Sequence, residues 1–281
     1  MRSGKIMLTL LCFLLAACSS QNESLPPISS QAIVGGEEVL ANDALISSTV
    51  SLVANVSGAP VSVCSGVLIS HNLVITAAHC LVNFDQLPLV VYFGAKLPTT
   101  MEDPGMVAVA QAIFHKQYTR VKDGWGRYVT TLNDIGLIKL AEEIPAGAQP
   151  VAILDQGIEL PAPTEILLAG YGIINEIGEV QQAEGLNKAR VTLVNVEDSI
   201  LVADHRDGQG ACRGDSGGPA FLETPQGLVL VAVTRGAHGG ALNCRSFGEY
   251  TSASYHKQMI LEQARLMQAE APQFVAVPAA N

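Results

Sequence analysis

Positively charged residues are scarce in this 281-residue sequence. Lysine and arginine together number 16 against 26 aspartates and glutamates, which gives a net charge of −10. A chain this acidic has no extended basic face to neutralise phosphates, so we do not expect nucleic acid as a partner. Hydrophobic residues make up 48% of the chain and charged residues only 15%, a balance that excludes global disorder.

Long hydrophobic runs are also missing. No stretch reaches the roughly 18 apolar residues that predict a membrane-spanning helix. Residues 6–17 form an apolar run that is too short to cross a bilayer, and Arg2 and Lys5 precede it. Residues 1–17 are therefore predicted to be a secretory signal peptide, and the protein is expected to be exported.

The apolar run ends in Leu-Ala-Ala-Cys, which resembles the bacterial lipoprotein signal, whose cysteine receives a lipid. We expect Cys18 to become a lipidated N-terminus; an ordinary signal that happens to end in cysteine is the alternative. Residues 18–32 are polar, contain two prolines and lack periodicity, as is typical of a tether or propeptide. The protein is then a membrane-anchored lipoprotein of the cell envelope, or is secreted once the tether is cut.

The cysteines lack the spacing of a metal site. Of the six, Cys12 leaves with the signal peptide and Cys18 is assigned to the lipid. The other four follow one another at intervals of 16, 132 and 32 positions, which match no zinc motif. An exported chain enters an oxidising compartment, so we expect two disulfides and neither a metal nor another cofactor. The four cysteines are Cys64, Cys80, Cys212 and Cys244.

The remaining chain is a series of short runs rich in Val, Ile and Leu, bounded by Gly, Pro, Asn or Asp. This pattern predicts an all-β fold, and ten or more strands at this spacing favour barrels or a sandwich. The predicted strands are residues 48–54, 63–70, 72–77, 89–94, 106–114, 135–140, 165–169, 190–196, 228–234 and 247–251. One helix is predicted from about residue 254 to 270, ahead of Pro272.

Four short segments carry residues suited to catalysis. Residues 214–219, Gly-Asp-Ser-Gly-Gly-Pro, expose the Ser216 hydroxyl on a tight turn where the N–H groups of Gly214 and Ser216 can face an oxyanion. His79 ends one apolar strand and Asp134 precedes another, and a histidine is the base that a serine hydroxyl needs near neutral pH. The fourth segment, Ile-Val-Gly-Gly at residues 33–36, follows the tether. Each segment alone is more often structural.

In this order, the four segments resemble the chymotrypsin-like serine proteases of the trypsin superfamily, from residue 33 to about 270. The resemblance implies two antiparallel six-stranded β-barrels with a C-terminal α-helix, so that residues 33–281 form one protease domain with two barrel subdomains and a short tail. It implies Ser216 as nucleophile, His79 as general base and then acid, and Asp134 as the group that orients the imidazole. The implied oxyanion hole is formed by the N–H groups of Gly214 and Ser216. The implied disulfides are Cys64–Cys80 and Cys212–Cys244.

The resemblance also marks a specificity pocket. Gly210, six residues before the nucleophile and followed by Ala211, matches the pocket floor, so the acidic floor that selects Lys or Arg is missing. Gly236 and Gly248 match two wall positions, which predicts an open, uncharged pocket and cleavage after bulky apolar or aromatic residues. An acidic preference is the rival, because three arginines surround the site in sequence: Arg213, Arg235 and Arg245.

Two features depart from the family pattern. Thr234-Arg235-Gly236 stands where many members have Ser-Trp-Gly, and the Thr234 hydroxyl is still able to hydrogen-bond Asp134. The only tryptophan, Trp125, lies in a long polar stretch, residues 116–133, which is either a lid of the cleft or a surface insertion. The histidines outside the triad are expected in surface or loop roles: His71, His115, His205, His238 and His256.

The Ile-Val-Gly-Gly segment resembles the mature N-terminus of the family. Cutting the Ala32–Ile33 bond frees an ammonium group at Ile33, which the resemblance pairs with Asp215. The expected product is a monomeric serine endopeptidase acting on proteins or peptides, with a lipid anchor before activation. An inactive binding protein of the same fold is the alternative, and the complete triad favours the enzyme.

Overall fold

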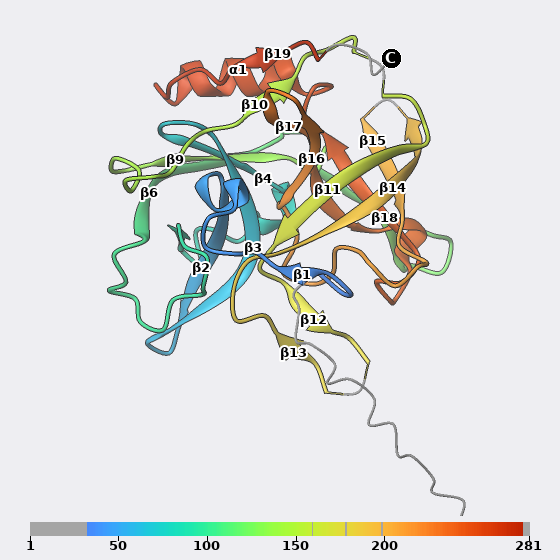
Figure 1. Cartoon of the computed structure of the whole chain (residues 1–281), viewed down its shortest axis with the longest axis horizontal. Helices are drawn as coiled ribbons and strands as arrows, with labels where there is room; N and C mark the ends of the chain where they lie inside the picture. Colours follow the sequence, from blue (N-terminus) through green and yellow to red (C-terminus); the bar gives the residue numbers. More distant parts are fainter. Residues whose placement is uncertain (1–32, 159, 178, 198, 278–281) are drawn as a thin grey trace, which may run out of the picture.

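The computed structural model describes residues 33–277 except 159, 178 and 198, and these residues fold mainly into β-strands (Figure 1). The signal peptide and tether predicted for residues 1–32 lie outside the described residues. All ten predicted strands are present, with ends shifted by up to a few residues. No helix of the described residues is long and apolar enough to cross a membrane.

The first barrel is closed by six antiparallel strands in the order β2-β3-β4-β9-β6-β5. They are β2 (Thr49–Val56), β3 (Ala59–Ser70), β4 (Leu73–Thr76), β5 (Leu89–Tyr92), β6 (Met106–Phe114) and β9 (Gly136–Leu140). Their inward side chains are mostly branched aliphatic residues, which suit a pleated, buried surface. Leu52, Leu68 and Val74 are among the fully buried members of this core.

The second barrel also has six antiparallel strands, in the order β16-β11-β14-β15-β18-β17, and pairing of β16 with β17 closes it. They are β11 (Thr164–Gly170), β14 (Asn187–Glu197), β15 (Ile200–Asp204), β16 (Pro219–Thr224), β17 (Gly227–Ala237) and β18 (Phe247–Ser252). Tyr250, Leu193 and Val231 lie in its core. The predicted pair of six-stranded barrels is confirmed.

Several shorter elements lie outside the two six-stranded barrels. β10 (Ala152–Leu154) pairs in parallel with β17 and with β19 (Phe274–Val275), an addition to the antiparallel barrel that the sequence did not indicate. Short strands are β1 (Glu37–Glu38), which pairs with β14, and the pair β12 (Ile173–Asn175) and β13 (Gln181–Gln182). Three 3-10 turns are η1 (Ala44–Ser47), η2 (Ala78–Cys80) and η3 (His238–Gly240).

The one α-helix of the described residues, α1 (Lys257–Leu266), is shorter than the predicted 254–270. The predicted first turn is a non-helical turn that leads out of β18, and residues beyond Leu266 turn back toward β19. Ile260 and Ala264 are fully buried on the helix and Met267 nearly so. These residues join the apolar cluster that lies between the barrels, which also includes Leu73 and Phe221.

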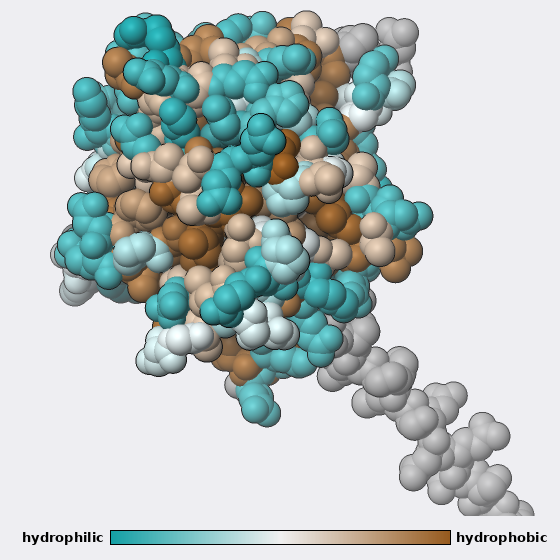
Figure 2. All heavy atoms as spheres, turned by 90° about the vertical axis from the view of Figure 1, so that its left-hand side faces the viewer, coloured by the Kyte–Doolittle hydropathy of each residue, from teal (hydrophilic) through white to brown (hydrophobic). Residues whose placement is uncertain are grey.

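Residues 116–133 do not form an irregular loop. They contain a hairpin of β7 (Thr119–Lys122) and β8 (Tyr128–Leu132), whose turn is fixed by the Asp123 carboxylate accepting the N–H groups of Trp125 and Arg127 at 2.9 Å each. Trp125 at the turn is 87% exposed. Figure 2 shows the left-hand side of Figure 1, where hydrophobic atoms gather across the middle and polar atoms lie around them.

Candidate active site

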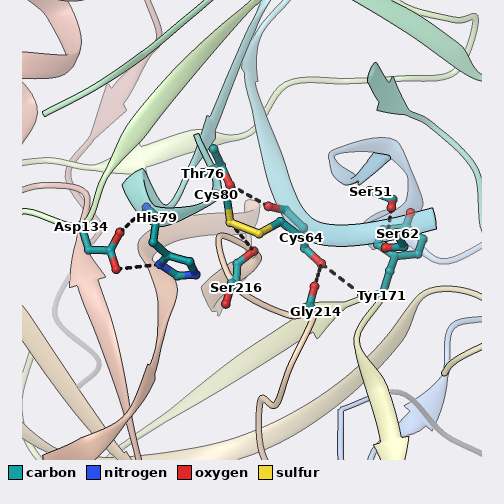
Figure 3. Close-up of a disulfide and its surroundings, with 11 residues drawn as sticks. Ser51, Ser62, Cys64, Thr76, His79, Cys80, Asp134, Tyr171, Gly214 and Ser216 are labelled. Carbon is teal, nitrogen blue, oxygen red and sulfur yellow. Dashed lines mark hydrogen bonds and ion pairs between the residues drawn. A yellow bond between two sulfur atoms is a disulfide. The ribbon is translucent and has the colours of Figure 1, made fainter. Parts of the chain in front are cut away.

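His79 and Asp134 meet at one end of the first barrel (Figure 3). His79 lies on η2, directly after β4, and Asp134 lies just before β9, which pairs with β4. Asp134 accepts the backbone N–H of His79 at 2.9 Å and faces ring Nδ1 at 2.8 Å. A carboxylate only accepts here, so the proton is on Nδ1 and Nε2 is left with a lone pair, as a general base requires.

Asp134 is fully buried but remains the charged partner of the pair. Burial acts to raise its pKa, while hydrogen bonds from His79 and Thr131 lower it. The hydrogen bonds prevail, and the pKa of Asp134 lies below its ordinary value. The carboxylate is therefore ionised at neutral pH and can stabilise a protonated imidazole.

The turn that carries Ser216 is braced from the first barrel by Ser65 of β3. The Ser65 backbone N–H donates to the Ser216 carbonyl at 2.8 Å, and the Ser65 hydroxyl donates to the Gly214 carbonyl at 3.0 Å. Gly214 and Gly217 adopt φ values of 92° and 79°, which a side chain would strain. A Cβ on Gly217 would also overlap Thr76, so the serine is held on a turn that only glycines allow.

Ser216 lies beside the His79 ring (Figure 3). The described residues contain no hydrogen bond between Ser216 Oγ and the ring, a contact that commonly tightens only when substrate binds. Within the same described part of the chain, the backbone N–H groups of Gly214 and Ser216 make no internal hydrogen bond. Both donors are thus available to a developing oxyanion.

Two disulfides flank these residues. Cys64–Cys80 joins β3 to the turn that carries His79, and Cys212–Cys244 joins the segment before Ser216 to the loop before β18. The two groups of possible metal ligands in the described residues each contain both cysteines of one disulfide. These sulfurs are not thiolates, so a metal would find only one other ligand in each group, His79 or Glu176.

Asp215 precedes Ser216 in the chain and is completely buried. It accepts the N–H groups of Gly172 at 2.8 Å and Cys212 at 2.9 Å. Burial outweighs these bonds and raises the pKa of Asp215 to about 7. Ile33 is also fully buried, and the next residue, Val34, accepts the N–H of Gly210 at 3.0 Å, so the expected activation segment pairs with the chain that leads to Ser216.

The hydroxyl of Thr131 on β8 donates a further hydrogen bond to Asp134, at 2.9 Å from Oδ2. Thr234 was expected in this role. Among the described residues, Thr234 takes part through its backbone, which pairs with Gly217 and Gly218. The hairpin of β7 and β8 lies close enough to Asp134 for the Thr131 hydroxyl to reach its carboxylate. Sequence reasoning missed it because the hairpin was not recognised.

Arg235, one of the three arginines, is enclosed by the same hairpin. It donates Nε to Thr131 and Nη2 to Thr130, at 2.7 Å each, and lies 3.5 Å from the Glu249 carboxylate. Its side chain is 3% exposed, and burial lowers its pKa. Glu249 also accepts Thr130 and faces His238 at 2.9 Å. Arg235 is therefore occupied inside the protein and does not reach a substrate.

A cavity of 340 Å³ opens beside Ser216. Four of the six predicted substrate-binding residues line it, namely Ala211, Thr234, Gly236 and Gly248, and Arg213 lines it as well. Gly210, expected at the floor, and Arg235 are not among the lining residues. His205, expected in a surface or loop role, lies in a loop after β15 but is only 2% exposed, and it lines this cavity with Tyr250. His256, with the same expectation, is in the turn that caps the N-terminus of α1 and is 4% exposed. The only sequence signal that His205 is buried was its position two residues after a short apolar run, residues 200–203.

Two closed barrels that bring a serine, a histidine and an aspartate together define the class of chymotrypsin-like serine proteases. The family model described as Trypsin matches residues 33–260, and the chain belongs to this family.

Relatives of the chain come from insect, mammal and mite. It is 30% identical over 182 residues to serine protease SP24D of Anopheles gambiae, covering 60% of this chain and 61% of that protein. It is 28% identical over 220 residues to coagulation factor XI of Bos taurus, covering 72% of this chain and 33% of that protein. It is 28% identical over 209 residues to trypsin Blo t 3 of Blomia tropicalis, covering 67% and 72%. The chain thus spans less than two thirds of the first two relatives.

Proposed function

We propose that this chain is a serine endopeptidase that works through Ser216, His79 and Asp134. The observation that carries the proposal is the double hydrogen bond from His79 to the buried Asp134, which fixes the imidazole with Nε2 free beside Ser216.

The reaction proceeds in two stages. Ser216 Oγ attacks the scissile carbonyl carbon while His79 Nε2 takes the hydroxyl proton, and the new oxyanion accepts the N–H groups of Gly214 and Ser216. His79 then gives the proton to the leaving amine, which releases the first product and leaves an acyl-enzyme. His79 then takes a proton from a water molecule, which attacks the ester carbonyl carbon. The bond to Ser216 Oγ breaks, His79 returns the proton to Oγ, and the acyl group leaves as a carboxylic acid. Asp134 stabilises the imidazolium in both stages.

Substrate selection is proposed to favour uncharged side chains in the cavity beside Ser216. No aspartate or glutamate is among the described residues that line the cavity, and the fully buried Asp215 is not one of them. Of the three arginines that suggested an acidic preference, Arg235 is buried against Glu249, and Arg245 lies 3.9 Å from Glu176. Only Arg213 lines the cavity.

Activation is proposed to follow cleavage between Ala32 and Ile33. The new ammonium at Ile33 would neutralise Asp215, whose raised pKa reflects a buried carboxylate with no cation beside it among the described residues. Ordering of the Gly214 N–H would follow. We further propose that residues 1–17 export the chain and that a lipid on Cys18 anchors it until this cut releases a soluble, monomeric enzyme.

Labelling with a fluorophosphonate tests the proposed chemistry. The chain beginning at Ile33 should acquire one adduct, on Ser216 by mass spectrometry, while a Ser216→Ala variant acquires none. Ser216→Ala and His79→Ala should each lower kcat on a peptide substrate by roughly three orders of magnitude or more. A correctly disulfide-bonded chain that neither labels nor cleaves would identify the fold as an inactive binding protein.

Release of the tether has a separate test. Fractionation and N-terminal sequencing should recover a membrane-bound inactive form beginning at Cys18 and a soluble active form beginning at Ile33. Active enzyme that retains residues 18–32 in the same chain would refute the activation scheme and leave the triad chemistry untouched.

A further inference from the structure

The floor of the cavity beside Ser216 is built in an unusual way. Gly210, which the resemblance places at the floor, is not among the residues that line the cavity, whereas His205 lines it and projects into the space that a side chain on Gly210 would occupy. A Cβ built on Gly210 would lie 2.7 Å from Cδ2 of the His205 ring and closer still to Cγ and Nδ1. The ring therefore takes the place of the missing side chain.

Gly248, which also lines the cavity, leaves space for the same ring. A Cβ on Gly248 would lie 2.6 Å from Nε2 of His205 and closer to Cε1. His205 follows β15 directly and Gly248 lies on β18, which pairs with β15. Two glycines, separated by 38 positions in the sequence, thus leave room for one imidazole between them. Neither can bear a side chain while the ring is in place.

Both ring nitrogens of His205 are engaged. Nδ1 lies 3.3 Å from the carbonyl oxygen of Cys244, which only accepts, so Nδ1 carries the proton. Nε2 lies 2.8 Å from the hydroxyl of Tyr250 and accepts its proton. Burial lowers the pKa of His205, against smaller opposing effects of the Cys244 carbonyl, Asp207 and Asp204. The ring is therefore neutral at neutral pH and fixed in direction.

We propose that His205 is a specificity-determining residue, whose ring shortens the cavity beside Ser216 and closes it with a neutral imidazole–phenol pair. The inference rests on the proposed endopeptidase function and makes it more specific. An imidazole is larger than the small side chains that a floor position could hold, so the space left suits unbranched or γ-branched aliphatic side chains such as Met and Leu. Large aromatic side chains meet the ring, and a Lys or Arg finds no carboxylate to pair with.

Kinetics on a series of peptide amides that differ only in the residue before the scissile bond test the proposal. The wild-type chain beginning at Ile33 should cleave after Leu or Met at least tenfold faster, in kcat/KM, than after Phe, Tyr or Trp. In His205→Ala, this ratio should fall by at least tenfold, because the cavity deepens. His71→Ala, which removes an exposed histidine paired with Glu270, is the matched control and should leave the ratio unchanged.

A small fluorophosphonate separates this inference from the proposed function, since it acylates Ser216 without filling the cavity. Labelling should proceed at the same rate, within about threefold, in wild type and His205→Ala. Normal labelling with an unaltered ratio in His205→Ala would overturn the role of His205. Fastest cleavage after Phe, Tyr or Trp by the wild type would overturn it as well, and needs no variant to fold. Failure of the wild type to label at all would instead count against the function.

A pair of variants tests the shared space directly. Gly210→Asp should lose folding or labelling, because its side chain collides with the ring of His205. Gly210→Asp combined with His205→Gly should regain labelling and cleave after Lys or Arg at least tenfold faster than the wild type does. If Gly210→Asp alone gains this cleavage to the same extent as the double variant, the ring does not occupy the floor and the proposal is wrong.

Discussion

The hydroxyl of Thr131 donates to Oδ2 of Asp134 at 2.9 Å, the same oxygen that faces Nδ1 of His79. Thr131 lies on the hairpin of β7 and β8, and its oxygen accepts Arg235 Nε at 2.7 Å. A buried guanidinium thus polarises the hydroxyl that supports the triad carboxylate. The hairpin is part of the support of the site and not only a surface insertion.

Replacing Thr131 by Val should remove one donor to Asp134 while keeping the shape of the side chain. A hydrogen bond to a charged group contributes about 1.5–3 kcal/mol, so we expect kcat to fall by roughly ten- to a hundredfold with KM little changed. The loss of the donor also raises the pKa of Asp134, so activity should disappear at a higher pH on the acid side. Rates measured from pH 4 to 9 give both quantities.

Thr130→Val is the matched control for this prediction. Thr130 donates to Glu249 and accepts Arg235, but does not touch Asp134. Its variant should lose stability without a shift in the acid limb of the pH profile, and Thr131→Ser should restore most of the rate. Equal pH profiles in the two valine variants would show that Thr131 supports the fold alone.

A second prediction concerns Gly217, next to the nucleophile. Its φ of 79° strains any side chain, and a Cβ would overlap Thr76 Oγ1 and the Ser65 carbonyl. Gly58, in the turn between β2 and β3, has a similar φ of 90° but no atom within 4 Å of a Cβ. Gly58→Ala should therefore lower the free energy of unfolding by about 1–2 kcal/mol, which is the backbone strain of an alanine at positive φ.

Gly217→Ala should cost clearly more than Gly58→Ala, because the overlap adds to the backbone strain. Its labelling by a fluorophosphonate should also slow markedly, since the turn that positions Ser216 must shift. Denaturant unfolding and labelling rates check the two variants side by side. Equal losses of stability with an unchanged labelling rate in Gly217→Ala would contradict the close packing of this turn.

The strands were predictable because they depend on local patterns, whereas the pair of barrels followed from the family resemblance, since the strand pattern alone left barrels or a sandwich open. Runs of branched aliphatic residues bounded by turn formers identify β4 or β9 without any knowledge of their partners. β16 escaped notice because it begins at Pro219, inside the glycine-rich motif. β7 and β8 were not predicted because their residues are mainly polar or exposed, and because their pairing depends on a turn around Asp123.

Roles that arise from distant residues were not predictable in this way. His205 enters the cavity because Gly210 and Gly248 both leave space, a relation that no local pattern records. The family pattern suggested Thr234 as the partner of Asp134, whereas the hairpin brings Thr131 to that place. The resemblance suggested which serine, histidine and aspartate to examine, but it gave no guide to their surroundings where the chain departs from the pattern.

The last prediction concerns the uncut chain and its dependence on pH. Asp215 has an ordinary pKa of 3.8 and a pKa of about 7 when buried. Between these values the folded state holds a proton that the unfolded state has released, so the free energy of unfolding falls as pH rises. The shift corresponds to a loss of up to about 4 kcal/mol between pH 4 and 7.

Cleavage before Ile33 should reverse this behaviour, because an ammonium beside Asp215 favours its ionised form and lowers its pKa. We expect thermal unfolding of the uncut Ser216→Ala chain to show a lower Tm at pH 7.5 than at pH 4.5, and adding Asp215→Asn to abolish most of that difference. Asp207→Asn, at an exposed carboxylate, is the control and should leave the difference in place. The same Ser216→Ala chain beginning at Ile33 should lose little or no Tm over this pH range. If it loses as much as the uncut chain, the new N-terminus does not pair with Asp215, and activation must work by another route.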